Sequence, residues 1–279
     1  MIKELSKTIL PSRVWASLRV ARIKWGINHY QTREVTHLYG GNPLRIHLAD
    51  PMAQGWYDHD WPELNEIALL KRNRLKPGAR VFDLGAHQCV VALMLANAVG
   101  PDGVVIALEA SPHNAAVGVR NQKLNQTENL HILNAAVAET SGRLTFNKGL
   151  NGQVDDGSGE WGSVEVDAFS VDALSARYGF PDVLFIDVEG FECEALRGAP
   201  ETLARQPDCF VEVHVGVGLE RFGGSAEAVI SFFPRSMYDI FVASEDHPEF
   251  VPLTPDAGLL LTRFFLLAIN RRPLSGLKD

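Results

Sequence analysis

Short runs of apolar residues recur along the chain from residue 79 onward, and stretches with helical spacing separate them. The runs are continuous in Val, Ile and Leu rather than alternating with polar residues, which is typical of strands buried on both faces of a parallel sheet. We expect five such strands, at 80–86, 103–110, 130–137, 181–190 and 209–215. Strands that alternate with helices in this way predict a doubly wound α/β fold.

The C-terminal part of the chain has a different pattern. Two apolar runs, 238–244 and 258–270, follow each other without a convincing helix between them, which suits an antiparallel pair at one edge of the sheet. A short hairpin is expected earlier, from 142–149 and 163–169, joined by a segment rich in Gly and Asp. Loops of this kind often lie over the carboxyl ends of strands and shape a substrate pocket.

Basic residues are concentrated at the start of the chain. The first 40 residues contain seven Lys or Arg and two Glu, whereas the whole chain has a formal net charge of −8. Helical spacing relates four apolar residues of this arm, Val14, Leu18, Ala21 and Trp25. We expect residues 1–55 to form a basic helical extension that packs on the domain or on a second subunit of a homodimer. Peripheral contact with an anionic membrane surface is the alternative.

The composition is that of a soluble globular protein. Hydrophobic residues make up 46% of the chain, but no apolar run approaches the roughly 20 residues that span a bilayer. The negative charge makes nucleic acid a poor expectation as a partner. Three cysteines, Cys89, Cys193 and Cys209, lack metal-ligand spacing and cannot all form disulfides, so we expect free thiols and a cytoplasmic location.

The first two predicted strands end in residues that suit a nucleoside cofactor. Asp83 and Gly85 end the first strand, and Glu109 ends the second, where an acid can hydrogen-bond the hydroxyls of a ribose. A dinucleotide site needs several glycines beside the pyrophosphate, but here His87 and Cys89 follow the single Gly85. Asp83 would repel a phosphate and attract an ammonium group. S-adenosylmethionine, which has an ammonium and a ribose but no phosphate, therefore fits better than NAD.

Carboxylates are concentrated after the fourth predicted strand. Asp187 and Glu189 are two residues apart, so in extended geometry they share a face, and Glu212 and His214 repeat this spacing on the fifth strand. We expect Asp187, Glu189 and His214 to be catalytic. His214 suits a general base by its ordinary pKa of about 6.5. Asp187, Glu189 and Glu212 could instead bind Mg²⁺, although no sequence spacing demands a metal.

Structural interpretations of the same residues remain open. Asp187 could cap the next helix, Glu189 could hydrogen-bond its own loop, and His214 could be an ordinary core histidine. Glu192 and Glu194 are assigned to the first turn of the following helix, where carboxylates interact favourably with the positive helix end.

Four segments, "VFDLGAHQC", "LEASPHN", "LNAAVAETSG" and above all "LFIDVEGFECEALRGA", resemble the FkbM-type S-adenosylmethionine-dependent methyltransferases. The resemblance covers about residues 57–215. It implies the class I methyltransferase (Rossmann-like) fold, with a seven-stranded sheet and an antiparallel C-terminal pair, here over 56–279. The chain departs from the family pattern in two places. The family usually has Asn, an aliphatic residue and Gly at 87–89, and often a Lys in place of Phe185.

The resemblance also implies a cofactor site on three strand ends. It assigns Asp83, Gly85, Ala86 and His87 to the methionine end, Glu109, Ala110 and Ser111 to the ribose, and Asn134, Ala135 and Ala136 to the adenine. The implied function is O-methylation of a hydroxyl on a sugar, glycan or secondary metabolite. An NAD(P)-dependent oxidoreductase and a non-catalytic scaffold are the alternatives. Segment 50–61, which contains Trp and Tyr, could stack on an acceptor ring or simply pack over the sheet edge.

Overall fold

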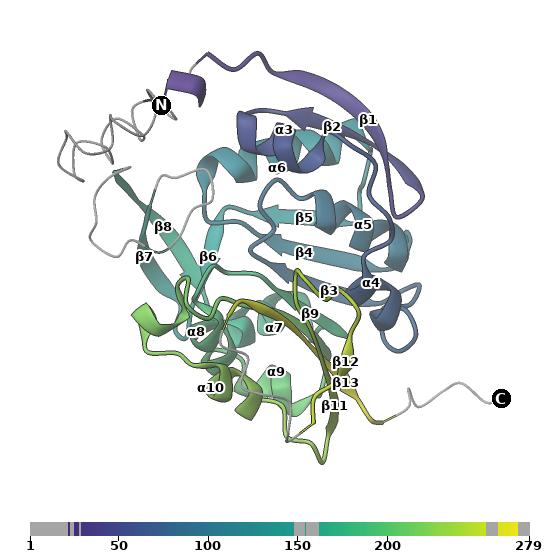
Figure 1. Cartoon of the computed structure of the whole chain (residues 1–279), viewed down its shortest axis with the longest axis vertical. Helices are drawn as coiled ribbons and strands as arrows, with labels where there is room; N and C mark the ends of the chain where they lie inside the picture. Colours follow the sequence, from purple (N-terminus) through teal and green to yellow (C-terminus); the bar gives the residue numbers. More distant parts are fainter. Residues whose placement is uncertain are drawn as a thin grey trace, which may run out of the picture.

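The computed structural model describes residues 22, 25–27, 29–147, 154, 162–254 and 262–272. Its central element is an eight-stranded sheet with strand order β12-β11-β13-β10-β9-β3-β4-β5 (Figure 1). Five neighbouring strands are parallel, namely β3 (Arg80–Leu84), β4 (Val104–Leu108), β5 (Leu130–Leu133), β9 (Val183–Ile186) and β10 (Asp208–Val213). These strands confirm the predicted doubly wound α/β fold, since each lies within or beside a predicted range.

The C-terminal strands complete the sheet. They are β11 (Tyr238–Ala243), β12 (Val251–Pro252) and β13 (Phe264–Asn270). β13 is antiparallel to both β10 and β11, between which it lies, so the predicted antiparallel pair is confirmed. The two-residue β12 adds an eighth strand to the expected seven. The first four residues of the predicted strand 258–270, at 258–261, lie outside the described residues.

The third predicted strand, 130–137, is divided in the structure. Its first half is β5, and its second half, β6 (Ala135–Val137), pairs with β8 (Ser163–Phe169) in a separate three-stranded sheet. β7 (Gly142–Asn147) pairs with β8 antiparallel, which confirms the predicted hairpin. The expectation of one continuous strand was wrong because Asn134 turns the chain out of the main sheet, with its side-chain amide bonded to the carbonyls of Glu109 and Ala110.

Helices cover both faces of the sheet. Successive residues of β3 face opposite sides, so that Val81 packs in one cluster with Leu70 and Leu93, and Phe82 in another with Leu174 and Leu196. The helices α4 (Asn65–Leu70) and α5 (Val90–Val99) contribute to the first cluster, and α7 (Val171–Tyr178) and α8 (Glu192–Arg197) to the second. Further helices are α3 (Pro51–Tyr57), α6 (Pro112–Leu124), α9 (Pro200–Ala204) and α10 (Ala226–Ser231), with the 3₁₀ helix η2 (Leu219–Phe222). This two-faced burial explains the continuous apolar runs of the strands.

Within residues 1–55, expected to be a helical extension, the structure contains a β-hairpin. β1 (Arg33–Tyr39) and β2 (Asn42–Leu48) pair antiparallel around Gly40 and Gly41, both with positive φ. Two glycines between apolar-containing runs are a hairpin signal that the sequence interpretation missed. The hairpin docks on α6, where the backbone N–H groups of Arg45 and His47 donate to side chains of that helix and its C-cap (Figure 1).

The predicted amphipathic arm falls largely on residues that are not described. Val14, Leu18 and Ala21 lie outside the described residues, and Trp25 lies in a helical turn with 64% of its surface exposed. None of the helices in the described ranges is long and apolar enough to cross a membrane.

Candidate active site

A cavity opens at the carboxyl ends of β3, β4 and β9. Ten of the thirteen predicted site residues line it: Asp83, Gly85, Ala86, His87, Glu109, Ala110, Ala135, Ala136, Asp187 and Glu189. The other three, Ser111, Asn134 and His214, lie behind its wall. The strand ends therefore converge on one cavity, as ligand sites in open α/β sheets do.

Glu109 follows β4 and is buried. Its Oε2 accepts a hydrogen bond from the N–H of His87 at 2.8 Å, and its Oε1 accepts from the N–H of Ser111 at 2.7 Å. Burial raises the pKa of Glu109 to about 8, although these bonds and one from Asn114 act to lower it. A carboxylate has about four acceptor positions, so three protein donors leave one for a ligand hydroxyl.

Asp83, the last residue but one of β3, has a different environment. Its Oδ2 is buried and has no hydrogen-bond partner in the part of the chain that the structure describes. Burial raises the pKa of Asp83 to about 7. Because leaving a buried acceptor unsatisfied costs free energy, a cationic donor in the cavity would be favoured at this atom.

The turn after β3 requires glycine. Gly85 has a φ of +93°, and a Cβ at this position would lie 1.7 Å from the carbonyl oxygen of Asp187. The N–H groups of Gly85 and Ala86 both donate to the carbonyl of Leu108 at 2.9 Å, and that of His87 donates to Glu109. These amides therefore have acceptors inside the protein, and contact with a ligand here falls to side chains and carbonyl oxygens.

Ser111 and Asn134 support the site from behind. Ser111 is the N-cap of α6, and its N–H holds the carboxylate of Glu109. The side-chain amide of Asn134 donates to the carbonyls of Glu109 and Ala110 at 2.8 and 3.0 Å. Both residues thus fix the segment that follows β4 rather than facing the cavity.

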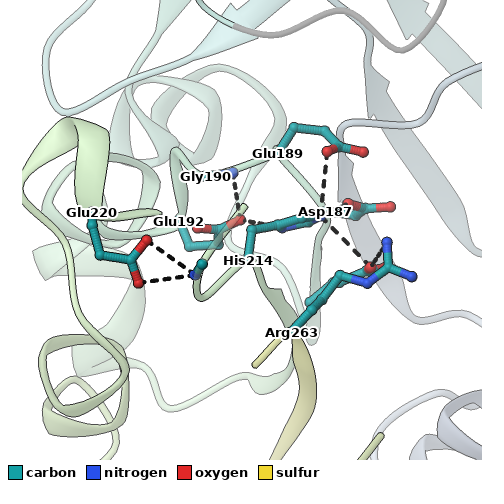
Figure 2. Close-up of polar contacts among 9 residues, drawn as sticks. Asp187, Glu189, Gly190, Glu192, His214, Glu220 and Arg263 are labelled. Carbon is teal, nitrogen blue, oxygen red and sulfur yellow. Dashed lines mark hydrogen bonds and ion pairs between the residues drawn. The ribbon is translucent and has the colours of Figure 1, made fainter. Parts of the chain in front are cut away.

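Figure 2 shows acidic side chains around His214, at the carboxyl ends of β9 and β10. His214 Nδ1 lies 2.6 Å from Oε1 of Glu192. Its Nε2 lies 3.4 Å from Oε2 of Glu189, 3.6 Å from Oε1 of Glu212 and 3.7 Å from Oδ1 of Asp187. The structure thus brings together the four polar residues that the sequence placed on two strand ends, and adds Glu192.

The expectation that His214 has an ordinary pKa is wrong. Burial disfavours the imidazolium, but the hydrogen bond to Glu192 and the charges of Glu189 and Asp187 outweigh it and raise the pKa of His214 to about 9. Without a bound ion the imidazole therefore keeps a proton at neutral pH, and His214 does not line the cavity. Glu192 does occupy the first turn of α8 as predicted, but its buried carboxylate also binds His214, which spacing alone did not reveal.

The chain turns sharply after β9. Glu189 has a φ of +52° and Gly190 a φ of +102°, and the N–H of Gly190 donates to Glu192. A left-handed conformation is unfavourable for Glu, and such strain is concentrated at functional sites. The turn leaves the side chains of Asp187 and Glu189 in the cavity wall, 39% and 19% exposed.

Comparison with protein families identifies the relatives of this chain. The model of the methyltransferase FkbM domain matches residues 83–240, which is more than half of the sequence. The chain belongs to the FkbM methyltransferase family. It is an S-adenosylmethionine-dependent methyltransferase with the class I fold, as the resemblance implied.

Several solved structures are similar at low identity. FkbM methyltransferase from Methylobacillus flagellatus KT is 15% identical with a TM-score of 0.45, and the match covers 68% of this chain but only 43% of that one. A SAM-dependent methyltransferase from Aquifex aeolicus is 16% identical (TM-score 0.42, 79% and 93% covered). Fibrillarin from Aeropyrum pernix, with bound S-adenosyl-L-methionine, is 14% identical (TM-score 0.43, 88% and 86% covered). A search of curated proteins found no match.

The structure accommodates the first departure from the FkbM pattern. Cys89, at the usual position of a glycine, has a φ of +63°, a conformation that glycine adopts without strain. The side chain of Cys89 is buried against Gly118 of α6, where an added Cβ would lie 2.5 Å from its Sγ. Gly118 therefore provides the space that Cys89 needs.

The second departure changes the cavity wall. Phe185, where the FkbM family often has Lys, lines the cavity and stacks on Phe210 with ring centroids 4.2 Å apart. An apolar ring thus stands two residues before Asp187, in place of a cation.

Aromatic residues of segment 50–61 form another part of the wall. Trp56, Tyr57 and Trp61 all line the cavity, and the hydroxyl of Tyr57 lies 2.8 Å from Nδ1 of His87. The sequence indicated this segment but no residue within it. Phe146 and Val154, which also line the cavity, belong to the predicted hairpin and its connecting segment. Asn114 and Phe191 had no recognisable signal because their positions depend on tertiary packing.

Proposed function

We propose that this FkbM methyltransferase transfers a methyl group to a hydroxyl of a sugar, glycan or secondary metabolite. The observation that supports the proposal is that one cavity joins two chemically different ends. Asp83 and Glu109 lie at the ends of β3 and β4, and Asp187 and Glu189 lie beyond the end of β9. The first pair suits the cofactor and the second pair suits an acceptor that must lose a proton.

The residues of the first pair fit S-adenosylmethionine, which supplies an electrophilic methyl group on a sulfonium. The buried, unsatisfied Oδ2 of Asp83 suits the ammonium group. The remaining acceptor position of Glu109 suits a ribose hydroxyl. Both oxygen sets lie in the cavity wall.

At the acceptor end, the chain aligns a hydroxyl and receives its proton. Methyl transfer to oxygen is mainly a matter of alignment, with proton removal by a base within hydrogen-bond reach. Asp187 and Glu189 are the carboxylates that line the cavity at this end, so one of them accepts the proton. His214 does not line the cavity, and through its contacts it positions these carboxylates.

The character of the wall favours a neutral polyhydroxylated acceptor. Carboxylates at both ends disfavour an anionic acceptor. Trp56 and Trp61 provide aromatic faces on which the apolar side of a sugar ring can pack. Both features agree with the substrate class that the family resemblance implied.

The test is a methylation assay with S-adenosylmethionine labelled in its methyl group. Acceptors would be offered in matched pairs, such as a sugar and its amino- or carboxy-substituted analogue. We expect label in an O-methyl group of the neutral acceptor, identified by NMR. Label on nitrogen or carboxylate instead, or no transfer by protein that binds the cofactor, would contradict the proposal.

A further inference from the structure

The carboxyl ends of β9 and β10 concentrate negative charge around one imidazole. Four carboxylates contact the ring of His214, which is only 1% exposed: Asp187, Glu189, Glu192 and Glu212. Such a group is unusual in a protein interior, where like charges repel strongly. A cation at the centre of these carboxylates would stabilise the arrangement.

Two atoms of this group face each other without a hydrogen-bond partner. Oδ1 of Asp187 and Nε2 of His214 are both buried, and neither has a hydrogen-bond partner within the described residues. They are 3.7 Å apart, which is too long for a hydrogen bond between them. Oε1 of Glu212 lies 3.6 Å from the same Nε2.

These separations suit a shared metal ion. The three ligand atoms, from Asp187, Glu212 and His214, all lie within 4.8 Å of one another. Nitrogen and oxygen ligands bind at about 2.0–2.2 Å, so two ligands of one ion are at most about 4.3 Å apart. The distances from Nε2 are inside this limit, and a small inward movement of Asp187 or Glu212 would complete the triangle.

Glu192 gives the imidazole the orientation that a metal ligand needs. Its Oε1 lies 2.6 Å from Nδ1 of His214 and also accepts from the N–H of Gly190, and its side chain is fully buried. Histidines that bind metals usually donate their other nitrogen to a carboxylate in this manner, which fixes the tautomer and directs the free nitrogen to the ion.

We propose that Asp187, Glu212 and His214 form a binding site for a divalent metal ion of the Mn²⁺ or Zn²⁺ type. The ligand set of one imidazole nitrogen and two carboxylates favours such ions over Mg²⁺, which prefers oxygen ligands. The all-oxygen Mg²⁺ set expected from the sequence, with Glu189 as a ligand, thus gives way to a set that includes His214. Glu189 remains close enough to be a fourth ligand.

Arg263 is the other cation in contact with this group. Its Nη1 lies 3.2 Å from Oε1 of Glu212, and its Nη2 contacts Glu245. Four ionised carboxylates exceed the combined charge of this guanidinium and a protonated His214, so a divalent ion in place of the imidazole proton improves the balance. Arg263 contacts the same oxygen of Glu212 that lies 3.6 Å from Nε2 of His214, so the ion would share this oxygen with the guanidinium.

The metal site would serve the reaction if the proposed function holds. Asp187 belongs both to the metal site and to the cavity wall, so an ion bound to it borders the acceptor. A hydroxyl bound to such an ion loses its proton more readily and is held in a fixed orientation. This role rests on the proposed O-methylation, whereas the binding of the ion does not.

Binding is tested with MnCl₂ alone, by EPR titration of free Mn²⁺ and by calorimetry, on the full chain. We expect one ion per chain, and at least about 10-fold weaker binding in Asp187→Asn and in Glu212→Gln. Glu192→Gln should weaken it about 10- to 100-fold, since an orienting carboxylate contributes that much. Glu220→Gln is the matched control, because Glu220 bonds the N–H of Gly216 nearby and its loss should leave binding unchanged (Figure 2).

Circular dichroism and titration with S-adenosylmethionine show which variants are folded. Absence of Mn²⁺ and Zn²⁺ binding by folded protein would overturn the metal site, as would binding that both ligand variants leave unchanged. Methyl transfer is measured separately, with and without EDTA. Metal binding without any methyl transfer would leave the site standing and reject the function. Full transfer with EDTA and no metal binding would do the reverse.

Discussion

The two ends of the cavity, proposed above for the cofactor and for the acceptor, hold carboxylates by different means. At the cofactor end, Glu109 is held mainly by backbone N–H groups, and Oδ2 of Asp83 has no hydrogen-bond partner among the described residues. At the acceptor end, Asp187 belongs to a group of side chains that contact one another through His214. The first end therefore depends on the path of the backbone, and the second depends on the presence of each side chain. Substitutions at the two ends should therefore change different properties of the protein.

The largest effect is expected where the two ends touch. Gly85→Ala places a Cβ 1.7 Å from the carbonyl oxygen of Asp187 at a φ of +93°. We expect the free energy of unfolding to fall by at least about 3 kcal/mol, because strain and backbone overlap add. Gly78→Ala is the control. Gly78 has a φ of +86°, but a Cβ added there would have no atom of the surrounding structure within 4 Å. Gly78→Ala should therefore lower the free energy of unfolding by only about 1 kcal/mol. Equal losses of unfolding free energy in the two variants, measured by urea denaturation, would show that the overlap with the carbonyl of Asp187 is unimportant.

Removal of the Glu109 carboxyl group should affect binding at the cofactor end alone. We expect Glu109→Ala to weaken binding of S-adenosylmethionine about 100-fold, because the hydrogen bond to the ribose and the support of the His87 and Ser111 amides are lost. Calorimetry measures this directly, with the demethylated product as a second ligand. Unchanged affinity in folded protein would place the ribose elsewhere.

Asp187→Asn should affect the acceptor end alone. We expect kcat to fall at least about 100-fold, which is the usual contribution of a general base, while the affinity for S-adenosylmethionine changes less than about 2-fold. Glu109→Ala is the comparison, because in that variant the affinity for S-adenosylmethionine is expected to fall. A matching loss of cofactor affinity in both variants would mean that the two ends are not separate.

The turn after β3 can be tested through its packing. We expect Gly118→Ala to lower the free energy of unfolding by about 2 kcal/mol, since its Cβ would lie 2.5 Å from Sγ of Cys89. The same substitution in a Cys89→Gly background should be nearly neutral, because the overlapping sulfur is absent. A double-mutant cycle in denaturant gives the interaction energy. Additive effects would show that Cys89 does not need the space at Gly118.

The smallest effect is a pH dependence at the cofactor end. The pKa of Glu109 is about 8 in the folded protein against an ordinary 4.5, so between these values the native state keeps a proton that the unfolded state has lost. Its contribution to the free energy of unfolding therefore falls as pH rises through this window and is constant above it. Glu109→Gln removes the dependence. We expect the variant to gain at least about 1 kcal/mol on wild type between pH 5 and pH 9, since each pKa unit corresponds to about 1.4 kcal/mol.

The sequence placed the cavity residues of β3 and β4 more fully than the group around His214, for a physical reason. Asp83, Gly85 and Glu109 follow directly from where apolar strands end, which is local information. The pKa of His214 depends on carboxylates from separate segments, and only the assembled fold brings them together. Glu192 was assigned to a helix end because its spacing is helical, and its partner lies 22 residues away.

The same distinction applies to the fold. Buried parallel strands produce continuous apolar runs, so the central sheet was predictable. The hairpin at residues 33–48 was missed although Gly40 and Gly41 mark its turn, because a basic arm with helical spacing precedes it. The departure of β6 from the main sheet depends on the side-chain bonds of Asn134, which no local pattern encodes.

The position of β13 has a consequence for synthesis on the ribosome. Strand β13, Phe264–Asn270, lies between β10 and β11. Until it has been synthesised, each of these two strands has an unpaired edge. The half of the sheet that carries Asp83 and Glu109 can form earlier during translation. Arg263, the guanidinium partner of Glu212, arrives immediately before β13. The acceptor end is thus completed last. During synthesis the unpaired edge of β10 is exposed to pairing with another chain, which is a route to aggregation.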